Sequence, residues 1–182
     1  MSGIAATWIW LLDRGTGLVT LPALWLAVVT GIFYRTRRPA IFHGIAQRHH
    51  LSISAFALVI TSMHAIVGIL DTVMLGAGLA PAPNYPLWFF YGGAVVGVLA
   101  FATLLLAVAS FLAPWRFDHP SLVHALAYVG FVFGIAHAVA IGTDVVGLTE
   151  NLVFVSLVLV AWALALKLFV GIGAGVRSIA GI

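Results

Sequence analysis

The sequence predicts an all-α membrane protein: a bundle of five transmembrane helices in a single domain over residues 1–182. Of the 182 residues, 63% are hydrophobic and only 7% are charged, whereas soluble domains carry about 25% charged residues. Apolar runs long enough to cross a bilayer recur along the whole chain. This composition leaves no segment for a soluble catalytic domain, and the lipid bilayer is the first partner that we expect.

The N-terminal apolar patch is predicted to lie at the membrane interface. It contains Trp8 and Trp10 and ends at the charged pair Asp13-Arg14. It is therefore too short to cross the bilayer, and tryptophans favour the headgroup region. In the alternative threading, residues 4–14 insert as a sixth helix, which would bury both charges. The five expected helices cover residues 16–34, 44–70, 87–112, 121–141 and 151–172.

The connections between these helices have the composition of helix ends. Residues 35–39 form the densest basic cluster in the chain, and residues 71–86 contain three prolines and no basic residue. A link with two prolines follows at 114–120, and a Gly-Thr-Asp sequence closes the fourth helix at 142–144. Because proline and glycine disfavour a continued helix, these segments separate the apolar runs.

The charged residues indicate how the helices are oriented. With five helices, all basic residues except Arg14 gather on one side of the membrane: Arg35, Arg37, Arg38, Arg48, Arg116, Lys167 and Arg177. Most acidic residues fall on the other side: Asp13, Asp71, Asp144 and Glu150. Since basic loops stay in the cytoplasm, we expect a multi-pass protein of the cell (plasma) membrane with its N-terminus outside and its C-terminus cytoplasmic. The basic surplus thus reports orientation, and no nucleic-acid partner is predicted.

Two pairs of histidines lie within these apolar helices. His50 and His64 are fourteen residues apart in the second helix, and His124 and His137 are thirteen apart in the fourth. At about 1.5 Å per residue each pair spans roughly 20 Å, within a hydrocarbon core of about 30 Å. Because both helices run in the same direction, His50 and His124 share an inner level, and His64 and His137 an outer one. Two stacked bis-histidine haems between these helices would use all four imidazoles as iron ligands.

The helical wheel places a condition on this arrangement. At about 100° per residue, fourteen residues return to within roughly 40° of the start, so His50 and His64 share a face. Thirteen residues leave His124 and His137 roughly 140° apart. If both are to bind haem, the fourth helix needs a kink or a local change of winding, or the two haems must be offset. Small residues near the two levels would make room for macrocycles or serve helix packing: Ala57, Gly68, Gly130 and Gly134.

Three further histidines lie at the cytoplasmic boundary, where they are either solvated or in contact with haem propionates: His43, His49 and His119. His49 is the main rival to His50 as a ligand, and His119 is a rival to His124.

Several other observations define the alternatives. Arg48 and Arg116 are candidates to pair with the propionates of the inner haem, or they only anchor helix ends. The chain has no cysteine, which excludes thiolate-bound haem, iron–sulfur clusters and cysteine nucleophiles. Without haem, the buried histidines would instead form the relay of a proton-coupled transporter.

The spacing of the histidines resembles that of the ferric reductase-like transmembrane domain superfamily, which includes NADPH oxidases, iron and copper reductases, and the haem subunit of the periplasmic methionine sulfoxide reductase system. A pair with thirteen intervening residues precedes a pair with twelve. The local strings that resemble bacterial members are Arg14-Gly-Thr-Gly17, Trp115, His124-Ala-Leu-Ala-Tyr128 and His137-Ala-Val-Ala-Ile-Gly-Thr-Asp144. The resemblance covers about Arg14 to Lys167.

This resemblance implies two haem b groups, the inner one held by His50 and His124 and the outer one by His64 and His137. The flavin and nicotinamide domain of the oxidases is absent from the sequence, so no flavin or NADPH site is expected within the chain. The donor would be a separate cytoplasmic flavoprotein or a membrane quinol, and the outer-side electron acceptor stays unknown.

The resemblance thus implies an oxidoreductase, or the electron-transfer subunit of one. Bis-histidine ligation fills both axial positions, so we predict outer-sphere transfer and no catalytic residue. The alternative is a transmembrane ferric, cupric or oxygen reductase that works with a separate flavoprotein. An acidic rim near the outer haem would attract a metal ion or a basic partner: Asp71, Asp144 and Glu150.

Overall fold

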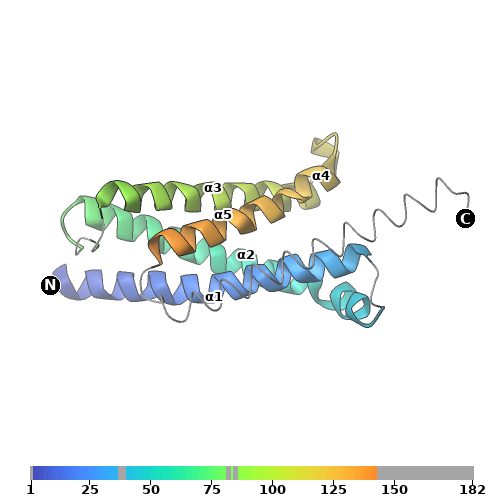
Figure 1. Ribbon diagram of the computed structural model, residues 1–182, viewed down its shortest axis with the longest axis horizontal. Coiled ribbons are helices and arrows are strands. Elements are labelled where there is room, and N and C mark those ends of the chain that lie inside the picture. The colour runs from blue at the N-terminus through green and yellow to red at the C-terminus, as the bar shows by residue number, and fades with distance from the viewer. Residues whose placement is uncertain (1, 37–39, 81–82, 84–85, 143–182) are drawn as a thin grey trace, which may run out of the picture.

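The computed structural model describes residues 2–36, 40–80, 83 and 86–142, and every regular element among them is a helix, with no strand. The elements in chain order are α1 (Ser2–Thr36), α2 (Ala40–Gly76), α3 (Leu87–Leu112), a short 3-10 turn η1 (Pro114–Arg116), α4 (Pro120–His124) and α5 (Leu126–Ile141) (Figure 1). The helix predicted over residues 151–172 lies outside the described residues.

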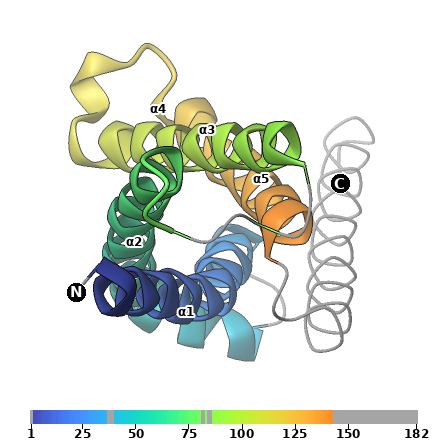
Figure 2. The same cartoon turned by 90° about the vertical axis from the view of Figure 1, so that its left-hand side faces the viewer.

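The long helices run up and down in turn and surround a common axis. α1 packs along α2, and α3 packs along α5, while α1 meets α5 and α2 meets α3 over shorter stretches. Viewed along the bundle, α1, α2, α3 and α5 form the four sides of a ring (Figure 2). We call the end at which α1 begins the N-terminal end of the bundle, and the end that carries η1 and α4 the opposite end (Figure 1).

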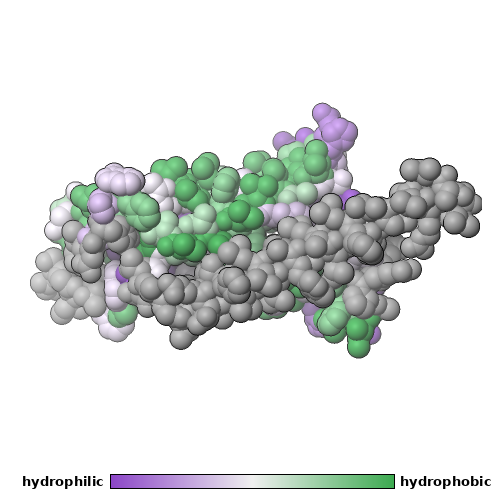
Figure 3. Space-filling model, in the orientation of Figure 1, coloured by the Kyte–Doolittle hydropathy of each residue, from purple (hydrophilic) through white to green (hydrophobic). Residues whose placement is uncertain are grey.

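Within the described residues, four helices are long and apolar enough to cross a membrane: Trp8–Thr36, Ile41–Gly76, Leu87–Leu112 and Pro120–Ile141. Their outward faces carry large apolar side chains, such as Trp88 at 73% exposed and Leu122 at 68% exposed. Figure 3 shows hydrophobic residues over α3 and hydrophilic residues where η1 and α4 lie. A surface of this kind matches the hydrocarbon of a bilayer and is unusual for a protein in water.

The interfacial position of Trp8 and Trp10 stays a prediction, but the first helix does not begin at residue 16, and residues 4–14 are not a separate sixth helix. They are the first turns of α1, which continues without a break to Thr36. The charged pair that suggested a boundary is accommodated inside the helix. Arg14 stacks over the ring of Trp10, 4.1 Å from its centroid, and the Asp13 carboxylate lies against His64 of α2.

The second helix is also longer than residues 44–70, because α2 continues to Gly76 and includes Asp71. It ends in a Schellman motif: the Leu79 N–H donates to the Met74 carbonyl, and the Gly78 N–H donates to the Leu75 carbonyl. Gly78 has a φ of 70°, which glycine adopts at little cost. Glycine, and not the acidic residue before it, therefore determines where this helix ends.

The fourth apolar run is interrupted between its two histidines, where a change of winding is expected if both bind haem. α4 ends at His124, and α5 begins at Leu126. At the break the Ala125 N–H is shared between the Leu122 carbonyl at 3.1 Å and the Ser121 carbonyl at 3.3 Å, and the Tyr128 N–H donates to the Ala125 carbonyl. The bonds to the third residue back are those of a tighter 3-10 turn, in which each residue advances about 120° rather than about 100°. The extra rotation, about 20° per residue over this turn, reduces the angle between His124 and His137 around the helix but does not close it.

The core lies in the middle of the ring, between the two histidine levels. Ala57 is 1% exposed and stands midway between His50 and His64, while Phe131 is fully buried and stands between His124 and His137. The buried cluster around them draws on all four long helices: Ala23, Leu24, Val28, Ile32, Ala57, Leu104, Phe131 and Ile135. This layer fixes the separation of the levels above and below it.

Gly130 provides a test of how closely α5 packs on α3. A Cβ placed on Gly130 would lie 2.7 Å from Thr103 Oγ1 and 3.1 Å from the Ala100 carbonyl oxygen, whereas one on Gly134 meets nothing within 4 Å. We expect Gly130→Ala to be less stable than Gly134→Ala by about 1–3 kcal/mol, the usual range for overpacking. Both variants share the helix propensity gain of alanine, so the difference isolates packing. Unfolding in detergent measures it, and equal stabilities would contradict the described contact.

Candidate functional site: two histidine pairs

The structure brings the four histidines together as two pairs, each joining α2 to the α4–α5 segment. Near the N-terminal end, the rings of His64 and His137 face each other with centroids 5.9 Å apart and planes at 69°. We call these two the first pair. Toward the opposite end, His50 and His124 are close enough to interact electrostatically, and we call them the second pair. His124 is the most exposed of the four.

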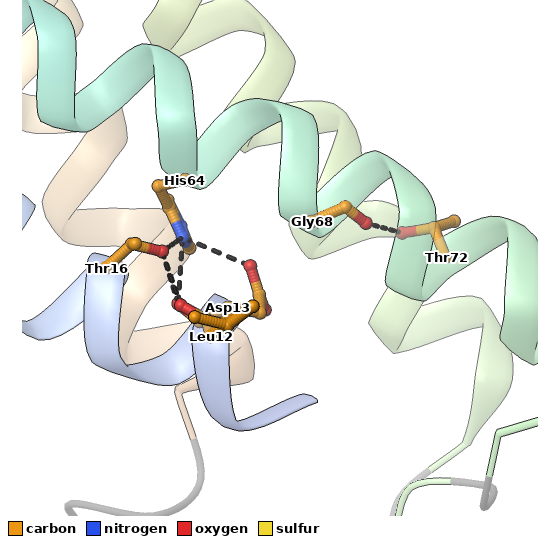
Figure 4. A network of polar contacts seen from close by, with 6 residues as sticks. All are labelled: Leu12, Asp13, Thr16, His64, Gly68 and Thr72. Atoms are coloured by element: carbon orange, nitrogen blue, oxygen red, sulfur yellow. Dashed lines mark hydrogen bonds and ion pairs between the residues drawn. The ribbon is translucent and has the colours of Figure 1, made fainter. Parts of the chain in front are cut away.

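Residues of α1 hold the Nδ1 atom of His64 (Figure 4). This atom lies 3.1 Å from the backbone oxygen of Asp13 and 3.4 Å from Thr16 Oγ1. The Thr16 hydroxyl already donates its proton to the Leu12 carbonyl, at 2.7 Å. Both groups therefore accept, and the proton of the interaction must sit on His64 Nδ1.

The same arrangement recurs for His50 one level along the bundle. Its Nδ1 lies 3.1 Å from Thr30 Oγ1, and the Thr30 hydroxyl donates to the Leu26 carbonyl at 2.7 Å. Thr30 therefore accepts from the imidazole, as Thr16 does. The hydroxyl of Ser54, on α2 itself, lies 3.5 Å from the same nitrogen.

Backbone carbonyls of α3 hold the other two histidines. His124 Nδ1 donates to the Ala107 oxygen at 3.0 Å, and His137 Nδ1 donates to the Gly93 oxygen at 2.8 Å. A carbonyl can only accept, so the proton is again on Nδ1. In all four imidazoles, Nε2 is then the nitrogen that carries a free lone pair. Imidazole ligands of metals commonly show this pattern, in which an acceptor behind Nδ1 fixes both tautomer and orientation.

A repeat of fourteen residues underlies this geometry. Thr16-Gly17 and Thr30-Gly31 are the same dipeptide fourteen residues apart on α1, which matches the spacing of His64 and His50 on the antiparallel α2. On α3, the two acceptor residues Gly93 and Ala107 are also fourteen apart. The repeated Thr-Gly was the sequence signal that could have identified α1 as the support for two histidines.

Glycines make room for three of the four rings. A Cβ on Gly17 would lie 3.1 Å from His64 Cε1, one on Gly31 would lie 3.0 Å from His50 Cε1, and one on Gly97 would lie 2.6 Å from His137 Nδ1. Beside the fourth ring, Phe111 stands fourteen residues after Gly97, with its centroid 6.3 Å from that of His124.

The glycines expected beside haem have other neighbours among the described residues. Gly130 packs against α3, Gly68 faces the Asp13 carboxylate, and Gly134 faces open space. The sequence shows which residues near the histidines are small, but it does not show which of them touch an imidazole.

The ring spacing of the first pair is compatible with one metal between the two imidazoles. Two imidazole nitrogens at about 2 Å on either side of one metal would place the ring centroids roughly 6 Å apart, close to the 5.9 Å of the first pair. No group of three or more histidine, cysteine, aspartate or glutamate side chains in the described part of the chain could hold a metal ion. Protein zinc sites need three or four ligands, whereas a porphyrin already supplies four nitrogens and needs only the axial ones.

The other candidate residues lie away from the pairs. His49, His119 and His124 are exposed, whereas His50 is partly buried. His50 and His124 are each joined to a neighbouring helix through Nδ1, so they are better placed as ligands than His49 and His119. His43 turns its Nδ1 to the Phe33 carbonyl, 3.3 Å away.

Arg48 and Arg116 are also exposed, and neither forms an ion pair with another described residue. Their role toward propionates stays a prediction. Asp144, Glu150, Lys167 and Arg177 lie outside the described residues.

A family model described as "Domain of unknown function (DUF8596)" matches residues 8–144. The matched range contains all four histidines, the acceptors of their Nδ1 protons and the three glycines that abut their rings. No curated protein and no solved structure matched the chain.

Proposed function

The chain belongs to the DUF8596 family, and we propose that it is a di-haem b-type transmembrane electron-transfer protein. One observation carries the proposal. All four imidazoles have Nδ1 held by a protein acceptor, no described residue bonds their Nε2, and they pair across helices at two levels. The ferric reductase-like superfamily, with the same histidine spacing, remains the nearest functional analogy.

When bound, the two haems would supply one-electron redox chemistry at two depths of the membrane. The residues of the chain do the rest. The Nε2 atoms of His64 and His137 would fill both axial positions of one iron, and those of His50 and His124 both positions of the other. Neither iron would keep an open position for a substrate. Acceptors behind Nδ1 orient each ring and raise its basicity as a ligand.

The geometry disfavours a proton relay as the role of these histidines. A relay through imidazole must pass a proton in at one nitrogen and out at the other. The Nδ1 protons of His124 and His137 are directed to backbone carbonyls, which cannot take up a proton and pass it on. Four rings locked in one tautomer suit fixed ligands better than a chain of exchanging donors.

We place the protein in the cell (plasma) membrane with the N-terminal end of the bundle outside. The connection between α1 and α2 carries Arg35, Arg37 and Arg38, and η1 ends at Arg116. By the positive-inside rule this end faces the cytoplasm. The second pair is then the inner one and receives electrons from a cytoplasmic flavoprotein or a membrane quinol. The first pair is the outer one and delivers them to an acceptor outside.

A reduced-minus-oxidised absorption spectrum of the purified protein tests this function. We expect the Soret and α bands of a low-spin b-type cytochrome, because bis-histidine ligation gives both irons six ligands. A protein purified from haem-sufficient cells without these bands would contradict the proposal and favour the transporter.

Gly97 gives a further test that leaves every ligand in place. A Cβ at this position would lie 2.6 Å from His137 Nδ1, whereas a Cβ on Gly92, in the same helix, meets nothing within 4 Å. We expect Gly97→Ala to displace the imidazole and lower the haem content from two to about one per chain. Haem-to-protein ratios measure this, with Gly92→Ala as the matched control. Full haem content in both variants would show that Gly97 does not position the ligand.

A further inference from the structure

The first pair has a carboxylate beside it, and the second pair does not. Asp13 Oδ1 lies 3.1 Å from His64 Nδ1, and the same carboxylate interacts electrostatically with His137 across the pair. At the second pair, the groups that meet Nδ1 are neutral: the hydroxyls of Thr30 and Ser54 and the carbonyl of Ala107. The two levels therefore differ in charge although they share their ligand type.

The bundle accommodates the carboxylate at this place. Gly68, one turn beyond His64 on α2, leaves the space that Asp13 Oδ1 fills, since a Cβ there would lie 3.1 Å from that oxygen. Asp13 Oδ1 is buried and has no hydrogen bond of good geometry, because the directed bond from His64 goes to the Asp13 backbone oxygen. The carboxylate thus acts on the ring by its charge. Figure 4 shows Asp13 and His64 facing each other.

A buried carboxylate oxygen without a hydrogen bond is destabilising unless a positive charge compensates it. The oxidised iron of a haem carries one more positive charge than the reduced iron. An anion behind an axial imidazole stabilises the oxidised form and raises the basicity of the ligand, and both effects lower the reduction potential. The next residue, Arg14, stacks on Trp10, and a substitution of Asp13 alone leaves Arg14 in place.

We infer that Asp13 is a positioning residue whose negative charge holds the reduction potential of the haem at His64 and His137 below the value that a neutral residue would give. This inference rests on the proposed function. The charge of Asp13 makes the outer haem a stronger reductant than it would be beside a neutral residue. Such a haem suits an acceptor of low potential.

A potentiometric titration of the purified haem-loaded protein, wild type against Asp13→Asn, tests the inference. We expect one of the two potentials to rise and the other to stay unchanged. The rise should favour the reduced form of that haem about tenfold or more, because a unit charge at this range has an effect of that size. Asp71→Asn is the matched control, since Asp71 lies toward the same end of the bundle and interacts electrostatically with Asp13, but no hydrogen bond or ion pair joins it to a histidine of the described residues. Its effect should be clearly smaller.

An unchanged or lower potential in Asp13→Asn, or an equal rise in Asp71→Asn, would overturn the inference. If Asp13→Asn loses the haem, Asp13→Ser and Asp13→Glu replace it, and only the neutral serine should raise the potential. Loss of that haem in every neutral variant but not in Asp13→Glu would show that the carboxylate retains the haem and does not set its potential, which also overturns the inference. A wild-type protein without haem would contradict the proposed function instead.

Discussion

His64→Ala, His137→Ala and the double variant of both are expected to lose the same single haem from each chain. The two rings lie 5.9 Å apart between centroids, so under the proposed function they would share one iron, and loss of either ligand should release that haem. The haem of His50 and His124 should remain in all three. Haem-to-protein ratios from pyridine haemochrome spectra would therefore be about one in each variant.

A second double variant distinguishes pairing across helices from pairing along them. His64→Ala combined with His124→Ala removes one ligand from each pair, and we expect no haem to remain. His49→Ala and His119→Ala are the controls, because both side chains are exposed and both variants should keep two haems. Additive losses in the His64 and His137 double variant, or one haem retained in the His64 and His124 double variant, would refute the assignment.

Electron transfer across a membrane is expected to require both pairs. The levels are fourteen residues apart along α2, or roughly 20 Å. Without one of the haems, an electron would have to cross this distance in one step, which is too far for efficient transfer. Vesicles that contain the protein and trap ferricyanide should oxidise an impermeant reductant added outside. We expect His50→Ala and His137→Ala each to lower this rate to that of protein-free vesicles, because each leaves a single haem.

His119→Ala provides the control for the vesicle experiment, since it alters an exposed histidine at the same end of the bundle as the second pair. Its vesicles should transfer electrons at the wild-type rate. A wild-type rate in His50→Ala vesicles would mean that the two pairs are not in series.

The spacing of the histidines predicted much of the site. Residues fourteen apart on one helix must share a face, and residues thirteen apart cannot unless the helix changes its winding. The tightened turn at Ala125 provides part of that change. Distances along a helix also predicted that His64 meets His137 and that His50 meets His124, because helices that run in the same direction place equal spacings at equal depths.

The continuity of α1 could not be predicted from the charges. Asp13 and Arg14 look like a membrane boundary because an unpaired charge in hydrocarbon is costly. Their partners are a histidine fifty-one residues away in sequence and a tryptophan ring one turn earlier. Charge counting along the chain sees neither partner, so it began the helix too late.

The acceptors behind the imidazoles were also missed, for two different reasons. On α3 they are backbone carbonyls of Gly93 and Ala107, and every residue has a carbonyl, so no side chain marks them. On α1 the repeated Thr-Gly dipeptide does mark them, but its meaning depends on knowing that α1 packs along α2. Packing between helices, and not periodicity within one, selects which small residues touch a ring.

The haem content of the wild-type chain tests the central claim most directly. Two pairs of histidines, each ring with Nδ1 held by the protein, predict two haem b groups per chain, both six-coordinate and low-spin, in protein purified from haem-sufficient cells. A ratio of two, with no high-spin component in the oxidised spectrum, is the expected result. A ratio of zero or one, or a five-coordinate haem, would contradict the account.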